Sequence, residues 1–195
     1  NGDALLVGGY LYAPNQAGTA IGLYVAPDSE VYNMTTGGVA GPAMVTSRRW
    51  LAGAENGGAI YALGGRGFVN GVIGMLGTVE KYDPAAGGDF VEVGTLSAPR
   101  GRHTAHTVGK NILVIGGMQY DGATGMVTNM TTGELYNTTA NVVETYTMVS
   151  DRNSHAAVTL QDGSILVIGG WAGGTTSTRG FDGTAVMQCE GFSIP

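Results

Sequence analysis

A short apolar run that ends in two glycines occurs four times in this chain of 195 residues. The copies are ALLVGG, IYALGG and twice ILVIGG, which begin at Ala4, Ile60, Ile112 and Ile165. The first glycine of each pair recurs with a period of about 50 residues, which is typical of arrays of small, similar structural units. The repeat constrains the possible folds more strongly than any other feature of the sequence.

Other segments keep a fixed place relative to these runs. An arginine recurs with a spacing of 52 residues, as Arg48, Arg100 and Arg152. A Glu-x-Tyr segment follows the glycine pairs, with tyrosines Tyr32, Tyr82 and Tyr136, and Met187-Gln-Cys189-Glu190 is interpreted as a degenerate fourth copy. All these segments are short and bounded by turn-forming residues, so they are predicted to be strands. The apolar runs do not alternate with polar residues, which favours strands covered on both faces.

The order of these features resembles that of the kelch repeat. It comprises an arginine, a histidine three residues later (His103 and His155), an apolar strand ending in Gly-Gly, and Glu-x-Tyr-Asp-Pro, complete at residues 80–84. The resemblance covers essentially the whole chain and implies an all-β fold, a kelch-type β-propeller of four-stranded blades. The tryptophan that the family usually has early in the fourth strand is replaced by Phe90 and Val142.

Within this fold we expect one domain with repeats at approximately 1–47, 48–99, 100–151 and 152–195, which supply three, four, four and three strands. The repeat is expected to be built on the arginines, the tyrosines and the glycines Gly64, Gly65, Gly116, Gly117, Gly169 and Gly170. Kelch propellers usually close with more blades, so three hypotheses stay open: a fragment of a longer propeller, two chains sharing one ring, or an unusual small or open propeller. Incomplete end blades expose edges and apolar faces, so we expect a homo-oligomer, a fibre or a longer parent chain.

The charge of the chain excludes two classes of partner. Its net charge is −6 with nine Lys plus Arg, so neither nucleic acid nor an anionic membrane is an expected ligand. No stretch is long and apolar enough to predict a transmembrane helix. Three Asn-x-Thr sequons, at Asn33, Asn129 and Asn137, together with low lysine content predict an extracellular glycoprotein, either secreted or at the cell surface. The first residues, Asn-Gly-Asp, lack an initiator methionine and suggest a processed piece.

The residue types that most often carry out catalysis point here to structural roles. His103 and His106 lie three apart on a predicted strand, so their side chains would point to opposite faces and not bind one metal ion easily. The arginine series could bind a carboxylate or sulfate at a propeller centre, but repetition favours bonds within the architecture. Cys189 takes a tyrosine position and is expected to be a buried, inert thiol. We expect no enzymatic activity, cofactor or metal.

The connections after the glycine pairs are the best candidates for a binding surface. They cover residues 10–29, 66–79, 118–133 and 171–186, and by repeat symmetry all four leave the same strand end and crowd one face. Their apolar and aromatic residues include Tyr10, Tyr12, Leu23, Tyr24, Phe68, Ile73, Met75, Leu76, Tyr120 and Trp171. Either the loops contact another protein, a second copy of the chain or a glycan, or they fold back to cap the propeller's own core.

The sequence therefore predicts an extracellular, non-enzymatic binding or assembly module. One alternative is an intracellular kelch adaptor for protein–protein interaction, which glycans on the sequons would exclude. A second alternative is the non-catalytic portion of a secreted propeller oxidase, because residues 44–50 and 160–167 are faintly similar to galactose-oxidase-like domains.

Overall fold

The computed structural model describes residues 3–14, 21–26, 28–69, 71–141, 143–173, 175–176 and 184–192. All regular secondary structure in these ranges is β, arranged as several small antiparallel sheets, as the sequence predicts. Within the same ranges the chain forms no helix long and apolar enough to span a membrane. Val142, one of the two residues at the tryptophan position, lies outside the described residues.

Four main sheets follow one another along the chain, one in each predicted repeat. The first consists of β1 (Ala4–Val7), β4 (Ser29–Asn33) and β5 (Gly37–Ala40). The second consists of β7 (Ala52–Asn56), β8 (Ala59–Leu63), β11 (Thr78–Tyr82) and β12 (Val91–Thr95). The third consists of β13 (Thr104–Val108), β14 (Asn111–Ile115), β17 (Thr132–Asn137) and β18 (Val143–Thr147). The fourth consists of β19 (Ala156–Thr159), β20 (Ile165–Ile168) and β24 (Cys189–Phe192).

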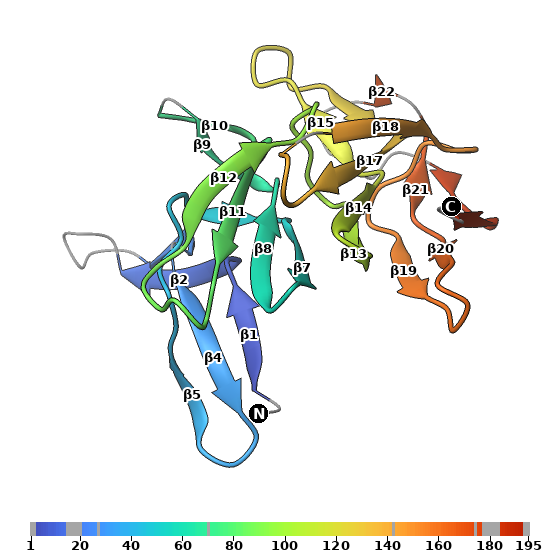
Figure 1. Ribbon diagram of the computed structural model, residues 1–195. Coiled ribbons are helices and arrows are strands. Elements are labelled where there is room, and N and C mark those ends of the chain that lie inside the picture. Colours follow the sequence, from blue (N-terminus) through green and yellow to red (C-terminus); the bar gives the residue numbers. More distant parts are fainter. Residues whose placement is uncertain are drawn as a thin grey trace.

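The long connections form secondary hairpins rather than open loops. β2 (Tyr10–Pro14) pairs with β3 (Ile21–Val25), and β21 (Trp171–Ala172) pairs with β23 (Thr184–Ala185). β9 (Arg66–Val69) pairs with β10 (Val72–Met75) and with β6 (Arg48–Arg49). β15 (Met118–Tyr120) pairs with β16 (Val127–Asn129), which also pairs with β22 (Thr175–Thr176). In Figure 1 the hairpin β9–β10 and strands β15 and β22 lie along the upper side, whereas the turns β4–β5 and β19–β20 point down.

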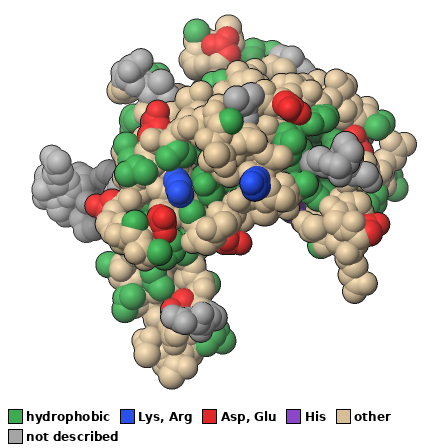
Figure 2. All heavy atoms as spheres, viewed as in Figure 1, with side chains coloured by type: hydrophobic (Ala, Val, Ile, Leu, Met, Phe, Trp, Pro, Cys, Tyr) green, Lys and Arg blue, Asp and Glu red, His purple; other side chains and the backbone are tan. Residues whose placement is uncertain are grey.

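The four main sheets stand side by side in an open arch. Figure 1 shows β1, β4 and β5 at one end and β19 and β20 at the other. Figure 2 shows the hollow on the underside of the molecule, between these two ends. The first and fourth sheets are therefore terminal, and in the described part of the chain each has one broad face without a neighbouring main sheet.

Adjacent sheets pack through alternate residues of their second strands. Tyr61 and Leu63 of β8 pack against Ile112 and Val114 of β14. The other two junctions follow the same rule, with Leu113 and Ile115 against Ile165 and Val167, and Leu5 and Val7 against Ile60 and Ala62. Each sheet thus has a following face, which packs on the next sheet, and a preceding face, which packs on the one before. Because both faces are buried, the apolar run has no polar positions.

The glycine pairs connect each sheet to the next. Gly65 N donates a hydrogen bond to Arg100 O at 2.8 Å, and Gly117 N donates to Arg152 O at 2.8 Å. Gly64 has a φ of +58°, and a Cβ at this position would lie 2.7 Å from Arg100 O. Both the left-handed backbone and the close approach require glycine here.

The repeat tyrosines belong to the preceding faces, and their burial depends on the neighbouring sheet. Tyr136 is fully buried against the second sheet. Tyr82 packs against Phe90 with ring centroids 5.6 Å apart. Tyr32 is exposed, because no main sheet precedes the first one in the described residues.

The fourth Glu-x-aromatic segment is not the one that the sequence predicts. In the third sheet Glu134 of β17 lies opposite Val114 of β14. The register of β20 and β24 gives the equivalent place to Glu190. Residues 190–192 are therefore the fourth copy, and the prediction of 187–190 was wrong, because phenylalanine replaces tyrosine and conceals the match.

Candidate functional site

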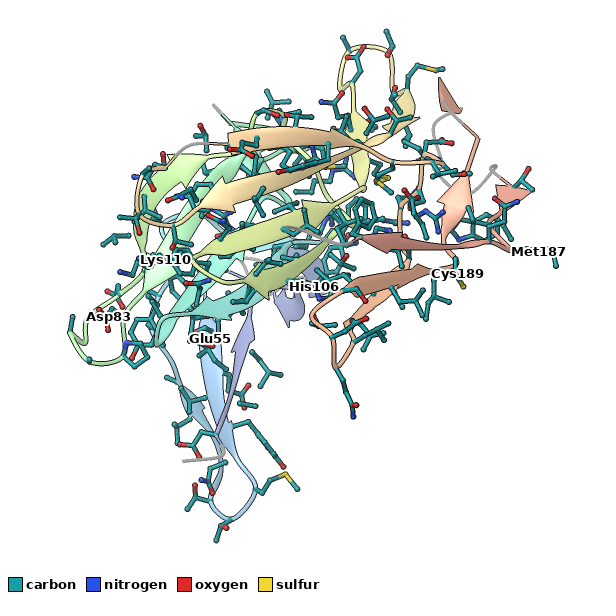
Figure 3. The ribbon with its side chains drawn as sticks, turned by 45° about the vertical axis from the view of Figure 1, so that its right-hand side comes forward. Glu55, Asp83, His106, Lys110, Met187 and Cys189 are labelled. Atoms are coloured by element: carbon teal, nitrogen blue, oxygen red, sulfur yellow. The ribbon has the colours of Figure 1, made fainter. Side chains whose placement is uncertain are left out.

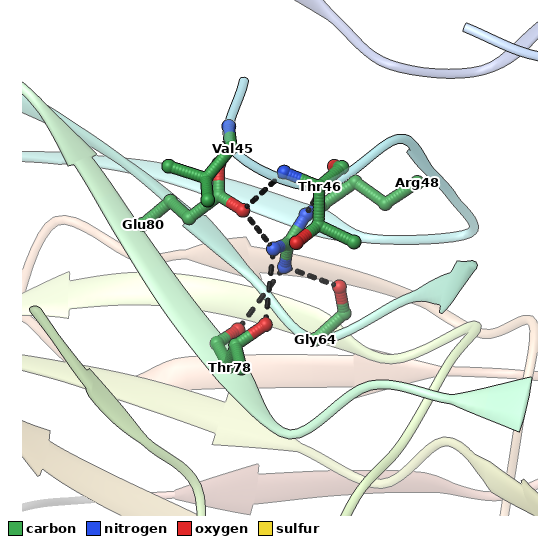
Figure 4. A network of polar contacts seen from close by, with 6 residues as sticks. All are labelled: Val45, Thr46, Arg48, Gly64, Thr78 and Glu80. Atoms are coloured by element: carbon green, nitrogen blue, oxygen red, sulfur yellow. Dashed lines mark hydrogen bonds and ion pairs between the residues drawn. The ribbon is translucent and has the colours of Figure 1, made fainter. Parts of the chain in front are cut away.

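The repeated arginines are buried, and their guanidinium groups bind backbone carbonyls and a glutamate of the same repeat. Arg48 is fully buried, and its Nη1 donates to Gly64 O at 2.9 Å and to Thr78 O at 3.1 Å. Its Nη2 forms an ion pair with Glu80, whose carboxylate also accepts the Val45 N–H at 3.0 Å (Figure 4). Burial lowers the pKa of Arg48, and the charge of Glu80 opposes this shift. The guanidinium is therefore engaged by the protein itself.

Arg100 repeats this geometry, and Arg152 repeats it more loosely. Arg100 is fully buried, donates to Gly116 O at 2.8 Å and forms an ion pair with Glu134. Arg152 Nη2 lies 3.6 Å from a carboxylate oxygen of Glu190, in the terminal sheet. This is the equivalent geometry that a structural role predicts, and it leaves these arginines poorly placed to bind a carboxylate or sulfate ligand.

The histidines are also placed as structural residues. His103 is buried with Nε2 3.1 Å from Leu63 O, and burial together with the charge of Arg100 lowers its pKa to about 3. His155 has Nε2 3.1 Å from Thr104 Oγ1, and burial is the main cause that lowers its pKa to about 4. In the part of the chain that the structure describes, no three His, Cys, Asp or Glu side chains gather as a metal site requires.

The three sequons have different environments. Asn33 ends β4 and Asn137 ends β17, and the side-chain oxygen of each accepts two backbone N–H groups of the following turn. Asn129 is 7% exposed, and its Oδ1 accepts a hydrogen bond from Asn153 at 2.6 Å while its Nδ2 donates to Trp171 O at 3.3 Å. The prediction that a glycan could reach Asn129 is therefore wrong, because this connection folds into the β15–β16 hairpin.

Cys189 is exposed, contrary to the prediction of a buried thiol. It lies on β24 opposite Ile168 of β20, on the following face of the fourth sheet. Figure 3 shows Cys189 at the end of the arch, close to Met187. Its exposure follows from its place on a terminal face that no further main sheet covers in the described residues.

The terminal faces expose apolar side chains at positions whose equivalents in the inner repeats are buried. Ile168, on the following face of the fourth sheet, is 43% exposed, whereas the equivalent Ile115 of the third sheet is 0% exposed. Leu6, on the preceding face of the first sheet, is 53% exposed, whereas the equivalent Val114 is 0% exposed. The two ends of the arch therefore present the same kinds of surface that form its internal junctions.

The secondary hairpins bury one side and expose the other. Met75 and Leu76 are buried, and Met75 packs in a cluster with Met118, so these two predicted contact residues cap the protein's own core. Phe68 and Ile73 of the β9–β10 hairpin are exposed.

The remaining predicted contact residues are divided in the same way. Tyr10 is exposed, while Tyr120 and Trp171 are half-buried. Tyr12, Leu23 and Tyr24 belong to β2 and β3, but their side chains lie outside the described part of the structure. Each of the two interpretations of the connections thus fits some of their residues.

One cluster on the hairpin side was not predicted. The guanidinium carbons of Arg102, Arg49 and Arg66 lie 4.2, 4.7 and 5.4 Å from the ring centroid of Trp50. Trp50 and Arg102 both stand two residues after a repeat arginine, and both have left-handed backbones with φ of +56° and +58°. The sequence signal was this shared repeat position, occupied by bulky residues that rarely adopt positive φ. Arg49 and Arg66 join them only in the folded chain.

No protein-family model matches the chain, and no curated protein matches it. Among solved structures, the chain is similar to that of YjhT, a propeller-type protein, with a TM-score of 0.69 at 12% sequence identity. The match covers 85% of this chain and 49% of YjhT, so the chain spans about half the length of that protein. At this identity the likeness concerns the fold alone, an all-β arrangement of small antiparallel sheets.

Proposed function

We propose that the chain is a kelch-type propeller segment that acts as a non-enzymatic binding and assembly module, and that its first partner is a second copy of itself. The observation that carries the proposal is the pair of uncovered faces at the ends of the arch. The fourth sheet ends in a following face with Ile168, and the first sheet begins with a preceding face with Leu6. Every junction inside the chain joins a following face to a preceding face, so the two end faces are complementary in kind.

Approximate energies favour a closed pair over a single contact. Full burial of an aliphatic side chain is worth about 1.5–3 kcal/mol, so a half-exposed one gains about 1 kcal/mol when covered. A junction with about five such side chains gains about 5 kcal/mol, near the low end of the 4–15 kcal/mol cost of lost translational and rotational freedom. When two junctions form together and close a ring, the cost of lost translational and rotational freedom is incurred only once. The match covers 49% of YjhT, so a ring of that length needs further sheets, which either a second copy or a longer parent chain would supply.

Sedimentation velocity at micromolar concentration tests the assembly. We expect a species with twice the 19.9-kDa mass of the chain. Ile168→Glu places a charge on the following face and is expected to give monomer. Val91→Glu, at a site that is 56% exposed on β12, is the matched control and should leave the pair intact. A 19.9-kDa monomer in the unmodified protein would overturn the proposal, as would equal effects of the two substitutions.

The single cysteine gives a second readout of the same contact. Cys189 lies on the face that carries Ile168, so assembly should slow its reaction with a bulky maleimide as protein concentration rises. The control is a Cys189→Ser variant that also carries Lys110→Cys, which places the single thiol in the exposed turn between β13 and β14. This thiol should react at the same rate at every protein concentration. A Cys189 rate that does not change with concentration would show that this face is not the contact.

We further propose that the protein is extracellular and that the exposed side of the hairpins contacts another protein or a glycan. The turns that hold Asn33 and Asn137 are accessible, which supports attachment of sugars there. Phe68 and Ile73 supply the apolar surface that such a contact would use. The glycan analysis given in the Discussion tests the location.

A further inference from the structure

Three of the nine basic residues of this acidic chain gather on the hairpin side. The guanidinium carbons of Arg49, Arg66 and Arg102 all lie within 5.4 Å of the Trp50 ring centroid. No two of them are therefore separated by much more than the Debye length of about 10 Å at 0.1 M salt. Salt screens their mutual repulsion only partly, so the three positive charges repel one another.

Aromatic rings stack on the flat faces of these guanidinium groups. The Arg49 carbon lies 4.3 Å from the Tyr10 ring centroid, and the Arg66 carbon lies 4.4 Å from the Tyr120 ring centroid. Stacking of this kind uses the face of the guanidinium and leaves its in-plane N–H groups able to donate hydrogen bonds. The rings therefore fix the cations in position without neutralising them.

Two of the three guanidiniums have a buried nitrogen without a hydrogen-bond acceptor among the described residues. Among the described residues, no carboxylate lies within 4.0 Å of Arg49 or Arg66, and the Nε of each is buried without a hydrogen-bond partner. Arg102 Nη1 contacts Ser154 Oγ at 3.5 Å. Burial lowers the pKa of Arg49 and of Arg102; nearby Tyr10 opposes this shift, and the charge of Arg66 adds to it. An anion would supply both the missing acceptors and the missing negative charge.

We propose that Arg49, Arg66 and Arg102 form a binding site for a tetrahedral oxyanion, a sulfate or phosphate group. Such a group offers three or four oxygens to three guanidiniums, whereas a carboxylate offers two. Its charge of up to −2 also balances the charges of Arg49 and Arg66, which have no carboxylate within 4.0 Å among the described residues. The site uses residues outside the two end faces, so it goes beyond the proposed assembly and does not depend on it.

A neighbouring pocket does not compete for the anion. It has a volume of about 340 Å³ and is lined by Gly74, Met75, Pro99, Gln119, Tyr120, Asp121 and Thr128. Asp121 is acidic and none of these residues is basic, so a negative group is repelled there. The charges of the lining residues therefore favour the arginines over the pocket for an anion.

The test follows the fluorescence of Trp50. The chain has two tryptophans, and Trp171→Phe leaves Trp50 as the single reporter while keeping the backbone Trp171 O that accepts from Asn129. In this background, titration with sodium sulfate, and separately with sodium phosphate, is carried out at an ionic strength held constant with sodium chloride. We expect a saturable change in Trp50 emission with both ions. A response that is absent or does not saturate for either ion would overturn the proposal.

Charge variants show whether the response belongs to the cluster. Arg66→Gln is expected to weaken sulfate binding by about tenfold or more, because it removes charge-assisted hydrogen bonds. Arg66→Lys keeps the charge but loses the planar fork, so it should weaken binding too. Lys110→Gln removes the same charge from the exposed turn between β13 and β14, which Figure 3 labels, and should leave binding unchanged. Equal weakening by Arg66→Gln and Lys110→Gln would mean general electrostatic attraction and would overturn the site.

Two sources of the anion remain to be distinguished. Glucose 6-sulfate and glucose 6-phosphate are compared with the inorganic ions in the same titration. Tighter binding of an ester supports an anion carried on a sugar, and equal affinity supports a free ion. Unfolding midpoints in urea establish that each variant is folded. Sedimentation of Arg66→Gln, which should match that of the unmodified protein, keeps failure of this site distinct from failure of the assembly proposal.

Discussion

Replacement of Arg100 by methionine tests whether the buried ion pairs stabilise the repeat. Arg100 and Glu134 are both 0% exposed, and the arginine also donates to Gly116 O at 2.8 Å and to Thr132 O at 2.9 Å. Methionine has a similar length but neither charge nor donors. Arg100→Met therefore leaves the Glu134 carboxylate buried, with the Ser97 N–H at 2.8 Å as its remaining donor among the described residues.

The expected loss follows from the charge that stays behind. Removal of one member of a buried ion pair costs about 3–5 kcal/mol in the free energy of unfolding, because the other charge stays in a site of low dielectric constant. Arg152→Met is the matched comparison, since the Glu190 side chain is 8% exposed and lies 3.6 Å from Arg152. There we expect a smaller loss of about 1–3 kcal/mol, because the ion pair is longer and the Val149 N–H still donates to Glu190 at 2.7 Å.

Urea unfolding followed by far-UV circular dichroism measures these losses. The double substitution Arg100→Met with Glu134→Leu removes both charges and should recover most of the loss, because no carboxylate remains buried alone. A loss below about 1 kcal/mol for Arg100→Met would refute the reasoning. A double variant less stable than either single variant would do so as well, since the cost would then lie in lost packing.

Two further predictions concern pH and glycans. The free energy of unfolding should fall as the pH drops below 6.5, because His103 and His155, with folded pKa values of about 3 and about 4, stay neutral while their unfolded forms take up protons. Below pH 6.5 each histidine lowers the free energy of unfolding by about 1.4 kcal/mol per pH unit. In urea titrations at several pH values, His103→Gln should therefore remove about half of the pH dependence that the two histidines cause together. An unchanged pH dependence would contradict the conclusion that His103 is buried in its neutral form. Peptide mass spectrometry of the protein from its native source should find glycans at Asn33 or Asn137 and none at Asn129. Three unmodified sites would contradict the extracellular proposal. A glycan at Asn129 would contradict the burial of that side chain.

The main strands could be predicted because each repeat carries its own copy of every signal. The arginine, the unbroken apolar run and the glycine pair recur together, so one interpretation fits several segments at once. The fourth Glu-x-aromatic segment was misplaced because the prediction relied on tyrosine, and Phe192 stands in its place. The better guide was electrostatic: Arg152 needs a buried carboxylate partner, and Glu190 supplies it.

The connections could not be predicted in the same way, because part of their pairing is long-range. Asn70-Gly71 between two valines is a known hairpin signal and points to the β9–β10 hairpin. No local signal shows that β6 adds to that hairpin, or that β22 adds to β16. The arginine cluster depends on the same long-range contacts, since Tyr10, Trp50 and Arg102 come from three different repeats.

The two proposed surfaces act on the arch in different ways. An anion at the cluster would contact arginines that precede and follow the second sheet, so it would strengthen contacts inside the arch while the terminal faces stayed uncovered. A second copy would cover those faces and would bring no anion to the arginine cluster. Because a group that binds only the folded state adds RT ln(1 + [L]/Kd) to its stability, each proposal predicts its own concentration dependence. Because sulfate also stabilises folded proteins in general, the unfolding midpoint should rise with sulfate more steeply in the unmodified protein than in Arg66→Gln at fixed protein concentration. It should rise independently with protein concentration in the absence of sulfate.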